Sequence, residues 1–185
     1  MLAIGAAAWG CGGGSKAPRE HADAPASPPK GWRTVRNREV GFTLSVPRRW
    51  TARVKGSATL IRSDDKLLVL TVAADRGAEG RDLAPTDYAR RTLDDLPDFE
   101  GSVVPSARAV RGSPYRSARV DGVGTLRTSK RPERITVAAF HRARLVTYAV
   151  VAFSSTKVSQ GFFEPQLRRI LRSLRAQPAR SGRSG

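Results

Sequence analysis

The feature that most restricts the fold of this chain is a series of short β-type segments joined by connections of a few polar residues. The segment 42–46 alternates apolar and polar residues, which predicts a strand with one buried face. Pro47 should end the pairing of this strand, because proline has no N–H to donate. Two further strands are predicted at 59–62 and 66–74, separated by a polar turn at 63–65. The second is apolar on both faces, which is typical of an interior strand covered on each side.

Four more extended segments follow at 102–110, 116–126, 134–141 and 144–153. The connections between them are short and contain Gly, Pro or polar residues, which favours an antiparallel meander. The segment 145–153 is the most apolar, yet it is far shorter than the roughly 20 residues that a membrane helix needs. Its β-branched and aromatic residues indicate a strand instead.

Residues 85–96 change to helical spacing. Pro85 suits a first helical turn, and Pro97 should end the helix. One face of this helix carries Tyr88, Thr92, Leu93 and Leu96.

A second, strongly amphipathic helix is predicted near the C-terminus, where the apolar residues at helical spacing are Phe162, Phe163, Leu167, Ile170, Leu171 and Leu174. Pro165 should lie in its first turn, because proline deeper inside would break the helix, so Phe162 and Phe163 should belong to the entry segment. A basic helix of this kind could lie on a membrane, but packing on the domain's own sheet is favoured, because the sheet otherwise lacks a cover. The predicted fold class is α+β, an antiparallel sheet of about six to eight strands covered by two helices.

The segment 40–50 resembles an early segment of PsbP/Mog-type αβα sandwich domains, which occur in many small actinobacterial lipoproteins. Its glycine, phenylalanine, strand, proline and tryptophan are found here with Gly41, Phe42, Pro47 and Trp50. With the closing segment 167–174, the resemblance covers about residues 32–175 and implies an αβα sandwich. The motif is structural, so neither the photosynthetic nor the Ran-binding activity found in that family is transferred. Independently of the resemblance, Gly41 permits a turn, Phe42 should face inward and Trp50 should pack over the core rim.

The single cysteine lies at the end of a short apolar run. Residues 1–10 resemble a signal peptide, with a small residue before Cys11, which predicts a bacterial lipoprotein whose cysteine is acylated. No Lys or Arg precedes the run and Trp9 is bulky; a start codon assigned too far downstream would explain the first departure, and a fortuitous cysteine in a disordered leader is the alternative. Residues 11–31 should form the anchored cysteine and a flexible stalk, residues 32–175 the domain, and residues 176–185 a disordered tail.

Little in the chain predicts catalysis. One Cys and two His exclude a disulfide framework and an ordinary zinc or iron–sulfur site, and no cofactor motif is present. His141 has no G-x-S-x-G partner motif, so a weak hydrolase is only an alternative. The adjacent carboxylates at 64–65 and 94–95 are expected to be solvated, and the glycines at 122 and 124 to give a strand flexibility or a bulge.

Positive charge is the strongest chemical signal. The chain carries +17, and residues 32–175 hold 28 basic and 14 acidic residues. Such a charge attracts polyanions, and Arg168, Arg169, Arg172 and Arg175 on the closing helix are the candidate contacts. The competing explanation is a GC-rich genome, because the arginines are scattered and rarely interleaved with aromatic residues.

Together these patterns predict a non-enzymatic lipoprotein on the extracytoplasmic face of the cell membrane. It should be held there by acylated Cys11, and its domain should bind an envelope protein, glycan or lipid, with no metal and no cofactor. A polyanion-binding module for anionic lipid, wall polymer or nucleic acid is the alternative, although an exported protein is not expected to meet nucleic acid.

Overall fold

The chain is described by a computed structural model over residues 27–97, 99–103, 106–127, 130–142 and 145–177. The predicted signal peptide 1–10, Cys11, most of the predicted stalk and residues 178–185 lie outside the described residues.

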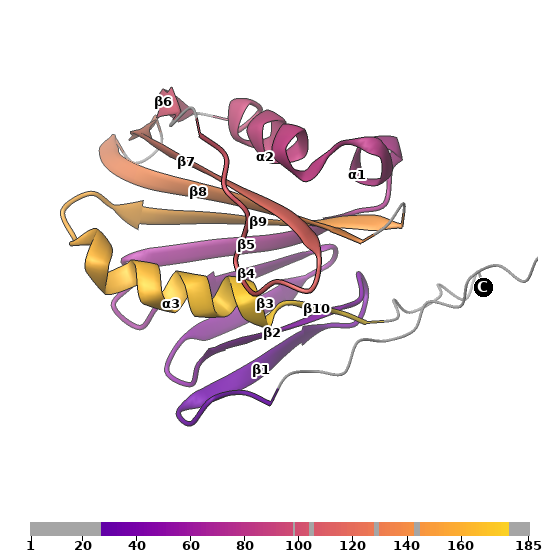
Figure 1. The fold of residues 1–185 in the computed structure, drawn as a ribbon. Helices are drawn as coiled ribbons and strands as arrows, with labels where there is room; N and C mark the ends of the chain where they lie inside the picture. The colour runs from indigo at the N-terminus through magenta and orange to yellow at the C-terminus, as the bar shows by residue number, and fades with distance from the viewer. Residues whose placement is uncertain (1–26, 98, 104–105, 128–129, 143–144, 178–185) are drawn as a thin grey trace, which may run out of the picture.

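The described part of the chain contains a seven-stranded antiparallel sheet (Figure 1). Its strands, in spatial order, are β3 (Thr51–Lys55), β4 (Ala58–Arg62), β5 (Leu68–Asp75), β9 (Val146–Ser155), β8 (Arg131–Arg142), β7 (Arg116–Leu126) and β6 (Phe99–Val103). The predicted meander is confirmed, since β6, β7, β8 and β9 pair in sequence order. Strand β3 was not predicted, because its five residues are mostly exposed and carry no clear alternation.

One predicted strand of the meander, 102–110, is wrong. The strand that pairs is β6, which ends at Val103, and the described residues 106–110 return to the sheet through an isolated bridge between Arg108 and Arg119. Pro105 follows β6 in the sequence and has no N–H for further pairing. Within β6, Gly101 lies opposite Gly124 of β7, where a Cβ atom on either residue would lie within 2.6 Å of the other's Cα. The glycines of β7 therefore permit a close approach of two strands.

A three-stranded sheet, not foreseen from the sequence, packs beside the large one. It consists of β1 (Trp32–Asn37), β2 (Phe42–Pro47) and β10 (Arg175–Ala176), with β2 in the centre.

Two predictions about β2 are wrong. Both of its faces are buried, including Thr43 and Ser45, because β2 is the central strand of the small sheet and also packs with α3, where the backbone N–H of Ser45 donates to Ser173 Oγ (2.8 Å). Pro47 does not end the pairing but lies opposite Trp32, at the last position of the strand, where a missing N–H interrupts no interior ladder. The predicted tail also begins too early, because Ala176 is fully buried in β10.

The described residues form three helices, α1 (Ala78–Asp82), α2 (Pro85–Asp94) and α3 (Gln160–Ser173). None of them is long and apolar enough to span a membrane. Helix α2 begins at Pro85 as predicted, although its buried face is formed by Ala89 and Leu93, with the larger residues around them only partly buried.

Helix α3 begins earlier than predicted. It starts at Gln160, so Pro165 is its sixth residue rather than part of its first turn, and Phe162 and Phe163 are helical. The proline removes one hydrogen bond, to the carbonyl of Gly161, and both residues are exposed, so water can satisfy that carbonyl. Phe162 is 56% exposed and does not contribute to the buried face.

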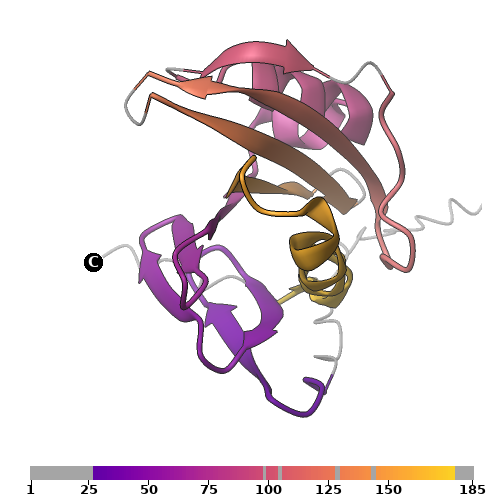
Figure 2. The ribbon, with the colours of Figure 1, turned by 90° about the vertical axis from the view of Figure 1, so that its left-hand side faces the viewer.

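The two faces of the large sheet are covered by different layers. On β8, Ile135, Val137 and Ala139 pack with α2, whereas Ala138 and Phe140 point the other way, into the core formed with α3 and the small sheet. Figures 1 and 2 show α1 and α2 on one side of the sheet and α3 on the other. The αβα sandwich is confirmed, with the small sheet lying beside α3 in the outer layer.

The 40–50 motif contributes residues to the core between the large sheet, α3 and the small sheet. Gly41 has φ 76°, which a turn requires, and its carbonyl accepts hydrogen bonds from Tyr148 Oη and from the N–H of Gln177, both 2.7 Å. The rings of Phe42 and Tyr148 meet edge to face, with centroids 6.0 Å apart, and Trp50 is buried in the same cluster. The motif therefore has a structural role, as expected.

Candidate binding surfaces of the domain

The arginines predicted as polyanion contacts lie on α3 and at its end, and each one makes a contact within the domain. The Arg169 guanidinium lies 5.3 Å from the ring centre of Trp32, and Arg168 pairs with Glu164 of the same helix at 3.3 Å. Arg169 therefore links the helix to β1, whereas Arg168 forms an exposed pair along the helix itself.

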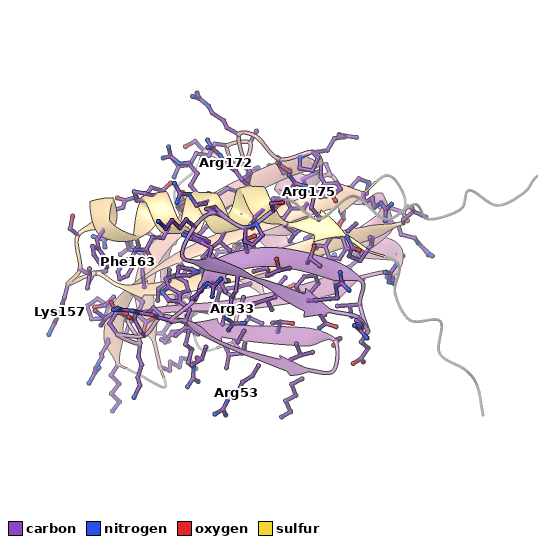
Figure 3. All side chains as sticks on the ribbon, turned by 90° about the horizontal axis from the view of Figure 1, so that it is seen from below. Arg33, Arg53, Lys157, Phe163, Arg172 and Arg175 are labelled. Carbon is purple, nitrogen blue, oxygen red and sulfur yellow. The ribbon has the colours of Figure 1, made fainter. Side chains whose placement is uncertain are left out.

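Of the two remaining arginines, Arg175 caps α3 and Arg172 links it to the segment before β7. Arg172 Nε donates to the carbonyl of Arg111 (2.7 Å), and Arg175 Nη1 donates to the carbonyls of Arg172 and Leu174 (both 2.7 Å). Figure 3 shows Arg172 and Arg175 near the C-terminal end of the helix. Cations at a helix C-terminus stabilise its free carbonyls, so the structure gives these residues a local structural role.

A second basic surface, absent from the sequence predictions, lies where the loops of the large sheet meet. We define the loop end by the turn 63–67 between β4 and β5, residues 127 and 130 between β7 and β8, and the segment 156–159 between β9 and α3. The strand register places these connections at one end of the sheet, and Figure 2 looks onto it. Three of the four lysines between residues 32 and 175 lie here: Lys66, Lys130 and Lys157.

A groove of about 400 Å³ opens at the loop end. Its cations are Lys66, Arg131 and Lys157, and Glu133 is its single acidic residue. Leu67 on its rim is 41% exposed, and its backbone N–H donates to Asp65 Oδ1 (3.0 Å). The apolar floor of the groove is formed by the partly buried Val69, Phe153 and Val158, and the exposed Pro132 also lines it.

The apolar floor remains open because of how the helices are placed. Helix α2 packs on β7 and β8, and the short α1 contacts β5 at its Asp75 end, so neither helix covers this face of β5 near Val69. Leu68 and Leu70 on the other face of β5 are fully buried, whereas Val69 is only partly buried. The prediction that β5 is covered on each side therefore holds for one face only.

The most buried charges lie under α3. Arg119 of β7 is 6% exposed and makes two hydrogen bonds to Glu164 of α3, Nη1 to Oε1 (2.7 Å) and Nη2 to Oε2 (2.8 Å). Its Nε donates to Asp121 Oδ1 (2.9 Å), and Thr136 Oγ1 donates to the same oxygen (2.6 Å). The exposed Arg108 completes the network, because its Nη2 donates a hydrogen bond to Asp121 Oδ2 (2.7 Å).

These contacts set the ionisation of the pair. Burial alone would raise the pKa of Glu164, but the hydrogen bonds and charge of Arg119, with help from Arg168 and Arg108, hold that pKa below its usual value. Burial lowers the pKa of Arg119, and the hydrogen bonds and charges of Glu164 and Asp121 more than offset it, so the guanidinium stays protonated.

The Arg119 network joins α3 to the large sheet, and its polar groups are paired with one another. Within the described residues, no buried side-chain nitrogen or oxygen lacks a hydrogen-bond partner. The cavity beside the network holds only about 140 Å³. From the sequence, the Arg119–Asp121 spacing puts both residues on one strand face, but the pairing with Glu164 could not be found there.

His141 lies one residue before the end of β8, as predicted. Its Nδ1 is 3.1 Å from Thr147 Oγ1, and that hydroxyl donates to the carbonyl of Gly80 (2.6 Å), so the imidazole donates to the hydroxyl oxygen. Thr147 is fully buried and is no accessible nucleophile. The imidazole also lines a shallow groove of about 760 Å³ with Arg81 and Arg116.

The remaining chemical candidates lie as expected. Asp65 accepts from the hydroxyl of Ser63 and the N–H of Leu67 within its turn, and Asp94 and Asp95 end α2. Among the described residues, no group of three or more His, Cys, Asp or Glu side chains is arranged to hold a metal ion.

Comparisons with solved structures support the fold. No family model matches the chain, and no curated protein matches it significantly. The solved structures that are similar to it include the following three. One is a Bacteroides thetaiotaomicron protein, with a TM-score of 0.52 and 11% identity over 78% of this chain; the chain spans 48% of its length.

The other two are similar to this chain over most of their own length. LpqN, "involved in cell envelope biogenesis of Mycobacterium tuberculosis", has a TM-score of 0.51 and 16% identity over 78% of this chain and 90% of its own. The Ran-binding protein Mog1p of Saccharomyces cerevisiae has a TM-score of 0.51 and 9% identity over 80% and 96%. The chain therefore has an α+β fold of the Mog1p type, which LpqN shares at low sequence identity.

Proposed function

We propose that this chain is a cell-envelope lipoprotein, anchored through acylated Cys11, whose αβα domain binds an envelope component without catalysis. The observation that carries the proposal is the shared fold with LpqN, a protein of cell envelope biogenesis, together with the cysteine that follows a signal-like apolar run. Neither feature alone specifies the function, since a fold hosts many activities.

The geometry of the polar groups supports binding over catalysis. The hydroxyl beside His141 is buried and donates to a backbone carbonyl, so it offers no attacking group. Arg119 and Glu164 satisfy each other beneath α3. The loop end offers a basic groove with an apolar floor, a feature suited to binding.

Metabolic labelling with an alkyne analogue of palmitate tests the anchor. The wild-type protein should incorporate the label and fractionate with membranes, and Cys11→Ala should lose both, because the chain has a single cysteine. Ser15→Ala is the matched control and should label like the wild type. Equal incorporation into wild type and Cys11→Ala would refute the anchor.

A polyanion-binding module remains the second candidate, and the loop end favours it. Lysines and arginines gather there around a groove with one acidic residue. Binding to a polyanion should weaken steeply as salt rises from low to physiological concentration, because bound counterions are released on association. A flat salt dependence would count against it.

A further inference from the structure

We propose that the loop end is a membrane-docking surface that binds the anionic phospholipid headgroups of the bilayer in which the protein is anchored. The proposal deepens the proposed envelope function and rests on it, because it names the surface that the tethered domain meets.

The charge of the loop end matches an anionic surface. Lys66, Arg131 and Lys157 line one groove against a single Glu133, and Lys130 lies in the adjacent turn. Lys66 and Lys130 have φ values of 59° and 51° in turns, which places two long cationic side chains at the tips of the two hairpins that flank β9. Each Lys or Arg near an anionic bilayer strengthens binding about 5-fold.

The apolar groups at the same place distinguish a bilayer from a soluble polyanion. Leu67, next to Lys66 in the turn, is exposed, and the half-buried Phe153 and Val158 lie behind it in the groove. An apolar side chain among cations can enter the boundary between headgroups and acyl chains while the lysines contact phosphates. A wall polymer or a nucleic acid backbone would gain nothing from Leu67.

The course of the chain places the loop end toward the membrane. The N–H of Arg48, which follows β2, donates to the carbonyl of Gly31 (2.9 Å), so the chain enters the domain beside the turn from β2 to β3. Thr51 at the start of β3 pairs with Arg62, next to the 63–67 turn. The described chain ends at the opposite end, where the N–H of Gln177 donates to Gly41.

The described chain therefore begins on the side that the groove faces. A flexible chain of the length of residues 12–26 would span about 20 Å on average, which would keep the domain close enough to a bilayer for its loop end to touch. An anchored domain meets the bilayer at high effective concentration, so even weak headgroup contacts suffice to orient it.

The experiment uses the full chain carrying Cys11→Ala, so that no acyl group contributes, in a flotation assay with phosphatidylcholine vesicles that contain or lack phosphatidylglycerol. The protein should bind the vesicles that contain phosphatidylglycerol, and this binding should weaken as the salt concentration rises. Lys66→Gln, Lys130→Gln and Lys157→Gln together should lower the partition coefficient about 100-fold.

A matched control removes the same charge elsewhere. Arg36→Gln, Arg38→Gln and Arg81→Gln alter three exposed cations at or near the other end of the molecule and should lower binding only a few-fold, since they lie beyond the range of screened attraction. Leu67→Ser should weaken vesicle binding several-fold and leave binding to soluble polyphosphate unchanged. Circular dichroism of each variant checks that the fold is retained.

Three results would overturn the proposal: equal partition of the two triple variants, equal binding to both kinds of vesicle, or an unchanged partition of Leu67→Ser. Binding to polyphosphate without binding to vesicles would assign the loop end to a wall polymer instead. Because the flotation assay needs no acylated cysteine and palmitate labelling needs no loop end, failure of this proposal is distinguishable from failure of the proposed function.

Discussion

The Arg119 network permits a quantitative test of what holds α3 on the sheet. Glu164→Gln keeps the size of the side chain and removes the charge that faces a nearly buried guanidinium. Removing one partner of a buried ion pair costs about 3–5 kcal/mol in folding stability. Here Asp121 remains on Arg119, and Glu164 retains 17% side-chain exposure, so we expect a cost just below that range, about 2–3 kcal/mol.

The control is Glu79→Gln. Glu79 pairs with Arg91 at 2.9 Å, but both side chains are more than half exposed, so this substitution should cost less than about 1 kcal/mol. Urea unfolding at neutral pH, followed by circular dichroism, measures both values, and the unfolding slope should stay constant between variants.

The stability difference between wild type and Glu164→Gln should also depend on pH, in a direction that the pKa of Glu164 sets. The folded-state pKa of Glu164 is lowered, so its carboxylate contributes stability that is fully present above the unfolded value of about 4.3 and is lost as pH falls through the folded value. The difference between wild type and Glu164→Gln should therefore shrink in acid. The reasoning would be refuted if Glu164→Gln cost no more than Glu79→Gln, or if the difference stayed constant below pH about 4.

Three further substitutions probe the packing, each by urea unfolding. Gly124→Ala should destabilise by about 1–3 kcal/mol, because its Cβ would lie 2.4 Å from a carbonyl oxygen of β6, whereas Gly161→Ala, with its nearest neighbour at 3.6 Å, should be neutral or stabilising; equal effects would contradict the close approach of β6 and β7. Phe163→Ala should cost about 3–5 kcal/mol and the exposed Phe162→Ala less than about 1.5, and the reverse order would mean that α3 is rotated. Asn37→Asp removes the two donors that reach the Gly56 carbonyl (3.2 Å) and Thr59 Oγ1 (3.1 Å) and should cost about 2 kcal/mol; a neutral result would show that this link between the sheets is weak.

Elements with a strong local pattern could be predicted from the sequence. Strand β7 begins and ends where the alternation predicted, and α2 begins at Pro85, because both depend on side-chain periodicity and on the missing N–H of proline. The early motif was also interpreted correctly, since Gly41 has the positive φ of a turn and Phe42 is buried. Pro165 was placed wrongly because the cost of a proline near a helix start depends on whether water reaches the freed carbonyl.

The candidate surfaces were much less accessible to sequence analysis. The α3 arginines stood out as a local cluster, but their contacts with Trp32 and with the carbonyl of Arg111 depend on segments that are far away in the sequence. The loop-end cations Lys66 and Lys157 are separated by about half of the chain, so no window of sequence shows them together.

The sequence alone determined the class of the fold, since hydrophobic periodicity and turn residues act over a few positions and can be recognised there. The tertiary structure decided which charges are buried, as with Arg119 and Glu164, and which apolar face stays open, as at Val69. The physical reason is that burial and electrostatic pairing depend on distances in space, and these follow from how the sheets and helices pack rather than from any local pattern of residues.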